Sequence, residues 1–211
     1  MNCKLIGNFV QYLEVTLSPG EDFYAEKGSL IYHETGIEKE LSFNGSGLRG
    51  LIGAKFSGES LFIIRLFNRT NHLRKLVIGS SYGLHPVKLT GESMICHRGV
   101  YVASNNRVDV STKISVQGLV GGMGLLLQKI SGNSTVFLDT KGSPISVNLQ
   151  TGETIEVDEN HIIALHSITE SQMTGNWSLG NLLGGEGLSM LRITGPGQIY
   201  LSPGAIHQPI N

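Results

Sequence analysis

The sequence carries little charge and no long apolar run, and these absences exclude some classes of protein. Charged residues make up 16% of the 211 residues, and the net charge is −1. This near-neutral balance argues against non-specific nucleic-acid binding, which needs a basic surface. No apolar stretch approaches the roughly 18 residues of a membrane-spanning helix, so no membrane span is expected.

Cysteine is scarce, and this bears on the cellular compartment. The two cysteines, Cys3 and Cys96, form no disulfide framework and cannot alone supply a tetrahedral zinc site. The first residues, MNCKLIGNFV, lack the apolar core of a signal peptide. We therefore expect a cytoplasmic protein.

The sequence has few motifs of enzymatic catalysis. No His-x-His metal-binding pair occurs in the chain. The Gly-x-Ser-x-Gly spacing is matched by GSSYG at residues 79–83, but the Val-x-Leu strand pattern of residues 87–92 follows it instead of the helix that a nucleophile elbow needs. The glycine clusters are followed by apolar residues typical of strands, whereas a phosphate loop or a dinucleotide fingerprint must open a helix. The sequence therefore predicts no catalytic residue, no cofactor and no metal site, and favours a protein that is not an enzyme.

The histidines and paired acids have ordinary explanations. His161 and His166 are five residues apart, so on one strand they would point to opposite faces. Asp158 and Glu159 fall in a predicted turn, where solvated charge is expected. All seven histidines are interpreted as surface or packed residues: His33, His72, His85, His97, His161, His166 and His207.

Glycine is abundant, with 28 residues, and much of it belongs to a pattern that occurs three times. Each copy begins Val-x-Leu and reaches a Gly-Glu pair, at residues 15–21, 87–92 and 147–153. Apolar residues stand two and four positions after each Glu, as on one face of a strand. These residues are Phe23 and Ala25, Met94 and Cys96, and Ile155 and Val157. Its place in this pattern indicates that Cys96 is a buried apolar residue instead of a nucleophile.

The same pattern predicts a turn. Seven residues after the Glu stand Gly28, Gly99 and Asn160. Because Gly and Asn accept a positive φ most readily, this position is interpreted as the left-handed residue of a hairpin turn.

A second signature, Gly-x-x-Gly-Leu-x-x-x-[Lys/Arg]-[Phe/Ile]-[Ser/Thr]-Gly, also occurs three times, at residues 47–58, 121–132 and 184–195. Apolar runs follow each copy, so each predicts a further hairpin. The turn positions would be the closing glycines Gly58, Gly132 and Gly195. We attribute the glycines to backbone geometry, such as close approach and bulges, instead of chemistry.

The basic residue of this signature has two interpretations. It is Lys55, Lys129 or Arg192 in the three copies. Three symmetric cations could contact an anion or an acidic partner. The alternative, which we favour, is that each pairs with a nearby acid. The candidate acids are Glu21, Glu92 and Glu153.

The two signatures alternate in a fixed order, which indicates an all-β chain of three tandem repeats. The repeats span approximately 1–78, 79–142 and 143–205, fused into a single domain over residues 1–211. No segment has a sustained helical period, although the sequence allows a single helical turn near residues 71–75. Each repeat alone would be marginally stable and would bury its open face against its neighbours.

These residues resemble the altered-inheritance-of-mitochondria family, which is tryptophan-RNA-binding-attenuator-protein-like and has bacterial and mitochondrial members. The resemblance rests on the Gly-Glu hairpins, on GGMGLLLQKISGNSTVFL at 121–138 and on VDENHIIAL at 157–165, and it covers nearly the whole chain. It implies three attenuator-like β-sandwich modules, related to the double-stranded β-helix, around a pseudo-threefold axis. It implies little about activity, because the family has no established enzymatic role.

Three functions remain open. The favoured one is a non-enzymatic scaffold or binding protein, with an unknown protein partner or with self-association into a homo-oligomer. The second is a small-molecule-binding sensor or a metal-free enzyme with a pocket between modules. The third, an RNA-binding ring subunit, ranks last, because charge is low and Trp177 is the sole tryptophan available for stacking on bases.

Overall fold

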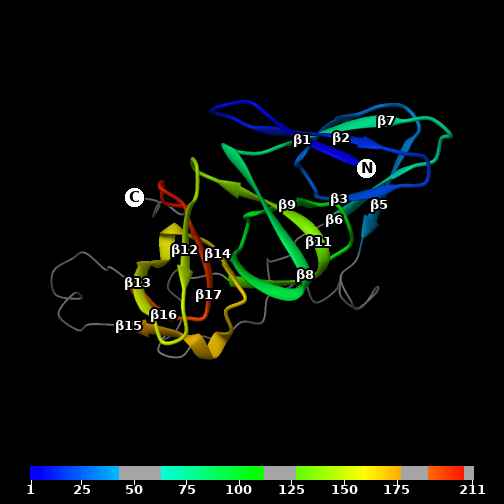
Figure 1. Ribbon diagram of the computed structural model, residues 1–211. Coiled ribbons are helices and arrows are strands. Elements are labelled where there is room, and N and C mark those ends of the chain that lie inside the picture. The colour runs from blue at the N-terminus through cyan, green and yellow to red at the C-terminus, as the bar shows by residue number, and fades with distance from the viewer. Residues whose placement is uncertain (43–62, 112–126, 177–189, 207–211) are drawn as a thin grey trace, which may run out of the picture. The chain divides into compact units, whose positions relative to one another are not determined.

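The computed structural model describes residues 1–42, 63–111, 127–176 and 190–206 (Figure 1). The regular structure of these residues is antiparallel strand, apart from two single-turn 3-10 helices, η1 (Glu159–His161) and η2 (Glu170–Gln172). The all-β prediction is therefore confirmed. No helical turn forms near residues 71–75: residues 70–72 form a bend, and strand β7 begins at Arg74. None of the helices among these residues has the length and apolar character needed to cross a membrane.

The chain divides into two compact units. Unit 1 contains residues Met1–Gly91, Gly99–Val110 and Ser131–Thr140, and unit 2 contains Glu92–Arg98, Ser111–Ile130 and Lys141–Asn211. Two long strands, β8 (Gly83–His97) and β11 (Leu127–Thr140), contribute residues to both units. The division into three sequence repeats stays a prediction.

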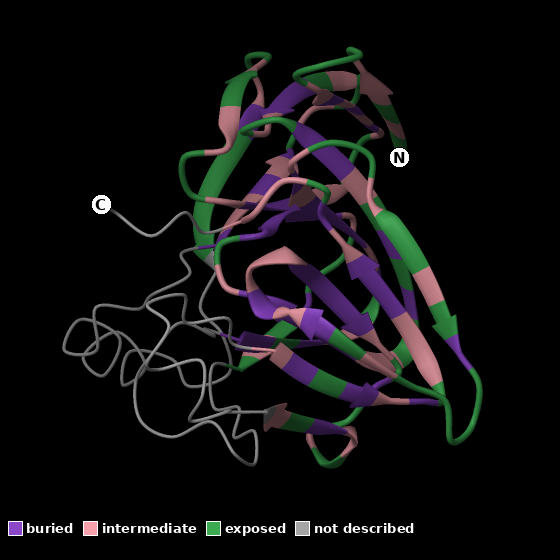
Figure 2. Cartoon of the chain, turned by 90° about the vertical axis from the view of Figure 1, so that its left-hand side faces the viewer, coloured by how far each residue is buried: buried purple, intermediate pink, exposed green. Residues whose placement is uncertain are grey.

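Unit 1 holds a four-stranded sheet in the order β1-β2-β7-β4. Its strands are β1 (Asn2–Ile6), β2 (Tyr12–Leu17), β7 (Arg74–Gly79) and β4 (Leu30–His33). The alternation on β2 shows why the chain forms a strand here: Leu13, Val15 and Leu17 are fully buried, and the residues between them are not. Figure 2 shows this alternation of buried and less buried residues along the strands.

The second sheet of unit 1 is built from the first part of β8, the last part of β11, and strands β9, β3, β6 and β5, in that order. The bounds are β9 (Tyr101–Ser104), β3 (Asp22–Glu26), β6 (Ile63–Asn68) and β5 (Ile37–Ser42), and the short strand β10 (Asp109–Ser111) pairs with β11. Side chains from both sheets form one apolar core, in which Val15 and Leu76 of the first sheet meet Phe23, Leu66 and Phe137 of the second.

Unit 2 also has two groups of paired strands. One has the order β12-β17-β14 and continues to the end of β8, where Ala164 pairs with Cys96. The other is the three-stranded sheet β13-β16-β15. The bounds are β12 (Ile145–Leu149), β17 (Gly197–Leu201), β14 (Ile162–His166), β13 (Thr154–Asp158), β16 (Met190–Thr194) and β15 (Met173–Asn176). Their core includes Ile95, Leu165 and Ile199.

The Gly-Glu pairs occupy two different local structures. In the first and third copies the chain makes the same turn: the backbone N–H of Glu21 donates to Ser18, and that of Glu153 donates to Gln150, each at 3.1 Å. The Glu side chains complete the turns, because they accept from the N–H groups of Ser18 at 2.8 Å and Gln150 at 2.7 Å.

The second copy makes no such turn. Its Leu89 and Gly91 are separated by a single residue, one fewer than in the other copies, and β8 runs through both positions. The deletion removes the residue that the turn would need, so the strand continues.

The predicted turn residues have mixed outcomes. Gly28 and Gly99 have φ values of +109° and +80°, and Gly195 follows the last residue of β16. Asn160 was predicted to have a positive φ, and this is wrong, because it lies in the 3-10 turn η1 and Ser167 is the one non-glycine with positive φ among the described residues. Gly132 is also not a turn residue, since it lies within β11 with φ +145°. Gly58 lies outside the described residues.

Candidate functional site

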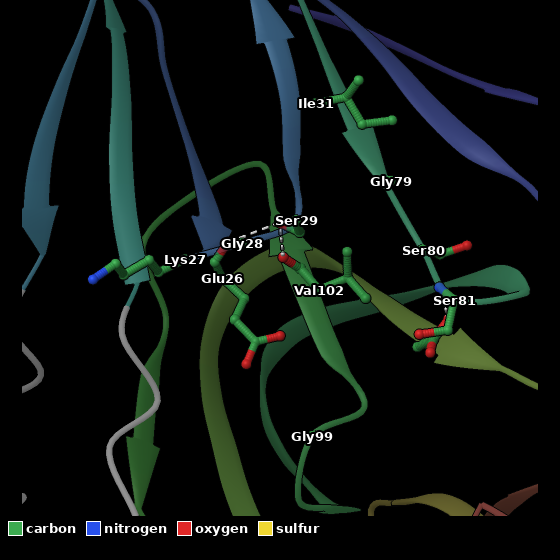
Figure 3. A pocket seen from close by; sticks show the side chains of 11 residues that line it. Glu26, Lys27, Gly28, Ser29, Ile31, Gly79, Ser80, Ser81, Gly99 and Val102 are labelled. Atoms are coloured by element: carbon green, nitrogen blue, oxygen red, sulfur yellow. Dashed lines mark hydrogen bonds between the residues drawn. The ribbon is translucent and has the colours of Figure 1, made fainter.

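A pocket of about 480 Å³ lies in unit 1, within the size range of small-molecule sites. Figure 3 shows it between the end of β3, the start of β4 and the segment that follows β7. The lining residues are Glu26, Lys27, Gly28, Ser29, Ile31, Gly79, Ser80, Ser81, Gly99, Val102 and Asp139.

A tight turn forms one wall. The backbone N–H of Ser29 donates to the carbonyl of Glu26 at 3.1 Å, and the Ser29 hydroxyl donates to the same oxygen at 2.8 Å. Gly28 supplies the positive φ that this turn needs. The Ser29 carbonyl then accepts from Gly79 at 2.7 Å, which joins the turn to the end of β7.

Glu26 is the last residue of β3 and extends its carboxylate into the pocket (Figure 3). It is half-buried, and within the described parts of the chain its carboxylate accepts no hydrogen bond and pairs with no cation. Burial, together with the nearby negative charge of Asp139, raises the pKa of Glu26 from 4.5 to about 7. Lys27 extends away from this carboxylate (Figure 3).

Asp139, on β11, is the second carboxylate of the pocket. Its Oδ1 accepts from the backbone N–H of Ser81 at 3.1 Å, which anchors the segment after β7. Burial raises the pKa of Asp139, and hydrogen bonds from Ser81, Tyr82 and Thr140 oppose the shift. The Asp139 carboxylate therefore has protein donors, whereas the Glu26 carboxylate has none among the described residues.

Three serines line the pocket, Ser29, Ser80 and Ser81, and Ser81 is the central residue of the GSSYG match at 79–83. Two of the three serine hydroxyls are already engaged: Ser29 donates to Glu26, and Ser80 donates to the carbonyl of Gln11 at 2.8 Å. No histidine lines the pocket, so no serine has a neighbouring imidazole base. Two carboxylates at a half-buried position instead favour a positively charged group.

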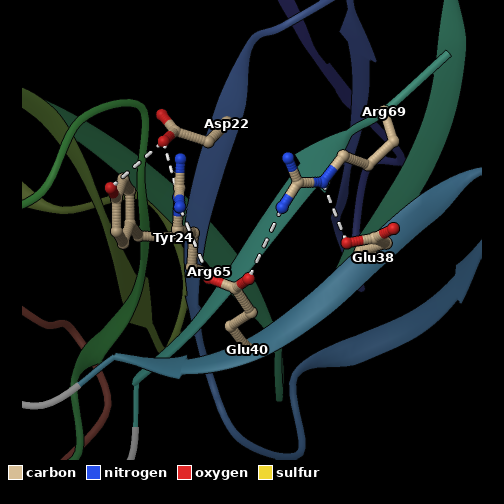
Figure 4. A network of polar contacts seen from close by, with 6 residues as sticks. All are labelled: Asp22, Tyr24, Glu38, Glu40, Arg65 and Arg69. Carbon is tan, nitrogen blue, oxygen red and sulfur yellow. Dashed lines mark hydrogen bonds and ion pairs between the residues drawn. The ribbon is translucent and has the colours of Figure 1, made fainter.

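A second set of charges in unit 1 is satisfied by its own members (Figure 4). Arg65 donates from Nε to Asp22 at 2.7 Å, and Arg69 donates to Glu38 at 2.9 Å. Both guanidinium groups lie over the Phe67 ring, at 4.7 and 4.6 Å from its centroid. Because each charge has a partner, this network stabilises the sheet of β3, β6 and β5 and leaves no charge for a ligand.

The two described basic residues of the second signature, Lys129 and Arg192, do not pair with the acids that we favoured. Arg192 lies opposite Glu156 on the neighbouring strand and donates to its carboxylate at 2.8 Å. Lys129 is exposed on β11, and Lys55 lies outside the described residues. The predicted acid partners bind other groups: Glu21 the N-terminal amine, Glu92 the imidazole of His166, and Glu153 the N–H of Gln150. The anion-binding interpretation stays a prediction.

The other residues considered in the sequence analysis, Cys96, His161 and Glu159, are buried or hydrogen-bonded within the fold. Cys96 is fully buried, as predicted, and burial raises its pKa to about 12. His161 donates from Nδ1 to the carbonyl of Ser202 at 2.7 Å. Glu159 was interpreted as solvated, and this is wrong, because it is buried within η1. No group of three or more His, Cys, Asp or Glu that could hold a metal occurs in the described segments.

Sequence reasoning missed Glu26 and Asp139. Both stand near turn residues, Ala-Glu-Lys-Gly and Asp-Thr-Lys-Gly, where a solvated acid is ordinary. One signal was present: the fifth residue after each Gly-Glu acid is polar, namely Glu26, His97 and Asp158. Each is the last residue of its strand. A polar residue at the same place in all three copies was therefore a signal of a candidate site.

The comparisons with known proteins agree with this fold. An uncharacterised protein of Streptococcus pyogenes serotype M6 is 26% identical over 161 residues, which cover 72% of this chain and 64% of that relative. A crystal structure of another S. pyogenes protein matches with a TM-score of 0.73 and 22% identity over 97% of this chain and 94% of that one. At this identity the likeness shows the fold alone.

The family comparison covers almost every described strand. The family model described as "Mitochondrial biogenesis AIM24" matches residues 3–204. This confirms the resemblance found in the Gly-Glu hairpins and in the glycine-rich stretch at 121–138. The chain therefore belongs to the AIM24 family.

Proposed function

We propose that this AIM24-family chain is a non-enzymatic binding protein and that the pocket of unit 1 holds a cationic group. The observation that carries the proposal is the Glu26 carboxylate, which is half-buried and has no donor or cation from the described residues. A carboxylate taken partly out of water without a partner is unfavourable when ionised. An incoming cation would supply the missing partner.

The second carboxylate strengthens this proposal. Asp139 places further negative charge in the same pocket and raises the pKa of Glu26. An ammonium or guanidinium group would interact favourably with both acids, and such charge-assisted hydrogen bonds are among the stronger polar contacts in proteins. An anionic ligand would meet repulsion from the same two groups.

The proposal favours binding over catalysis because of what surrounds the acids. The hydroxyls of Ser29 and Ser80 donate to backbone carbonyls, and no imidazole lines the pocket. A pair of acids with one raised pKa can act in proton transfer, so turnover of an amine substrate is an outcome that would revise the proposal.

We also propose how the repeats are arranged and in which compartment the protein acts. We infer that the sequence copies form three like modules around a pseudo-threefold axis, and the matching turns at residues 18–21 and 150–153 support this. Both cysteines are free thiols, which suits a reducing compartment such as the cytoplasm. Self-association into a homo-oligomer would cover open sheet edges.

The test uses Nα-acetyl-lysine methylamide, which carries a lysine side chain without backbone charges. Calorimetric titration at pH 8 should give a dissociation constant on the order of 1 mM, as expected of a single side chain. Affinity should fall about tenfold at pH 5.5, where Glu26 is protonated. Glu26→Gln should lose the binding, and Glu38→Gln, which removes an exposed acid outside the pocket, should keep it. Equal affinity in Glu26→Gln and the wild type would refute the proposal.

A further inference from the structure

An exposed apolar patch borders the pocket. Phe9 is 93% exposed, Val10 is 61% exposed and Tyr82 is 50% exposed. We call these three residues the tip patch. Single exposed apolar residues are common, but an almost fully exposed Phe beside a second apolar residue and a Tyr is a surface that typically contacts another molecule.

Hydrogen bonds hold the two segments of the tip patch together. Phe9 and Val10 lie between β1 and β2, next to Gln11, whose backbone N–H donates to the carbonyl of Tyr82 at 2.7 Å. The side chain of Gln11 accepts from the N–H of Leu84 at 2.8 Å. The β1–β2 connection is therefore fixed against the segment that follows β7.

The same segment forms a wall of the pocket. Ser80 and Ser81 line the pocket, and Tyr82 is the next residue along the chain. Ser81 also contacts Asp139 through its backbone N–H. The acids and the tip patch are thus connected through three consecutive residues.

A further exposed apolar side chain lies at the pocket itself. Ile31 is 63% exposed and lines the pocket. It lies over Gly79, where an added Cβ would be 3.1 Å from the Ile31 Cδ1 atom. The absence of a side chain at Gly79 therefore lets Ile31 lie against the end of β7.

We infer that the partner is a protein segment with a Lys or Arg side chain next to apolar residues, the basic group entering the pocket and the apolar residues packing on the tip patch. This inference rests on the proposed function. Charge complementarity selects the basic group, because Glu26 lacks a partner among the described residues. Phe9 and Val10 would pack against apolar residues next to the basic group of the partner. A free polyamine or a free lysine has no such residues.

The test compares two synthetic peptides, acetyl-Gly-Leu-Lys-Phe-Gly-amide and acetyl-Gly-Ser-Lys-Ser-Gly-amide. The first should bind the full chain at least tenfold more tightly than the second. The double variant Phe9→Ser/Val10→Ser should remove this difference and keep the affinity for Nα-acetyl-lysine methylamide. Leu73→Ser is the matched control, because Leu73 is 62% exposed and precedes β7 at Arg74, whereas the tip patch is joined to the segment after Gly79.

The outcomes separate the inference from the proposed function. Equal binding of both peptides, with Nα-acetyl-lysine methylamide still bound, would overturn the inference and leave the pocket as a cation site. Loss of binding to all three probes would overturn both. A dimer that dissociates in Phe9→Ser/Val10→Ser, with no affinity for either peptide, would show that a second copy covers the patch and would also overturn the inference.

Discussion

Glu26 and Asp139, on strands β3 and β11, line one pocket, and the charge of Asp139 helps to raise the pKa of Glu26 to about 7. The Asp139 carboxylate is held by the N–H of Ser81, whereas the Glu26 carboxylate has no donor within the described residues. The two acids therefore differ in role: one fixes the pocket wall, and the other is available to a ligand.

The stability of the protein should depend on pH through Glu26. A carboxyl group whose pKa is higher in the folded than in the unfolded chain binds more protons when folded, so its stabilising contribution is present at low pH and is lost as pH rises. For Glu26 the loss should fall between about pH 4.5 and about 7. Glu26→Gln should flatten this part of the profile and raise stability at pH 8 by about 1 kcal/mol, after a discount for solvent screening.

Urea unfolding of both proteins from pH 4 to 8 measures this effect. Glu38→Gln provides the charge control, because Glu38 is an exposed acid paired with Arg69 outside the pocket. A Glu26→Gln profile as steep as that of the wild type would count against the assignment. A smaller slope in the same direction should remain, because burial also raises the pKa of Asp139.

Asp139→Asn should lower the pKa of Glu26. The substitution removes the charge that acts on Glu26, and it keeps an oxygen that can accept from Ser81. The pKa should move toward 4.5 without reaching it, because burial is the larger cause. Carboxyl ¹³C titration by NMR measures the shift, and an unchanged pKa would show that the two acids do not interact.

The matched turns should have matched glycine requirements. Gly20 and Gly152 have φ values of +79° and +84°, and an added Cβ at either position would meet no atom within 4 Å. The cost of Gly20→Ala or Gly152→Ala should therefore come from the backbone alone, about 1–2 kcal/mol each. Chemical unfolding measures both variants, and a cost below about 0.5 kcal/mol would contradict the turn assignment.

Gly195→Ala should be more damaging than either turn variant. An added Cβ would lie 2.7 Å from the Cβ of Leu149 and close to the backbone carbonyl of Gln150. Because backbone atoms must move to relieve this contact, a loss of about 2–3 kcal/mol is expected. A near-neutral result in the same unfolding assay would show that the approach between these segments is looser than described.

Both thiols should react slowly in the folded protein. Burial raises the pKa of Cys96 to about 12, and burial is also the main reason that the pKa of Cys3 rises to about 11. Since the thiolate is the reactive form, a disulfide reagent at pH 8 should modify Cys96 only on unfolding. Fast modification of Cys96 in native buffer would reopen the nucleophile interpretation.

The sequence predicted the strands of the fold better than its connections. Phe23, Ala25, Met94 and Cys96 were correctly expected to be buried, but Tyr24 and Ile95 between them are buried as well, so both faces of these strand segments are covered. The positive φ at Gly28 and Gly99 followed from glycine itself. Asn160 misled because Asp158 acts as the N-cap of a 3-10 turn here: the amide and the backbone N–H of Asn160 both donate to the Asp158 carboxylate, which holds Asn160 inside η1.

The site could not be predicted in the same way. Glu26 and Asp139 meet through strand pairing between segments that are distant in the sequence, with β9 lying between β3 and β11. No local spacing encodes such a meeting. The ion-pair partner of Arg192 was also predicted wrongly. The repeat pattern suggested Glu153, but the register of β13 and β16 places Glu156 opposite Arg192.

The most direct test of the central claim is the ¹³C titration of the Glu26 carboxyl group with and without Nα-acetyl-lysine methylamide. The account predicts a pKa of about 7 in the free protein. It predicts a lower value at saturation, because a bound cation stabilises the ionised carboxylate. An ordinary carboxyl pKa in the free protein, or a raised one that the amine leaves unchanged, would contradict the assignment of this pocket as a cation site.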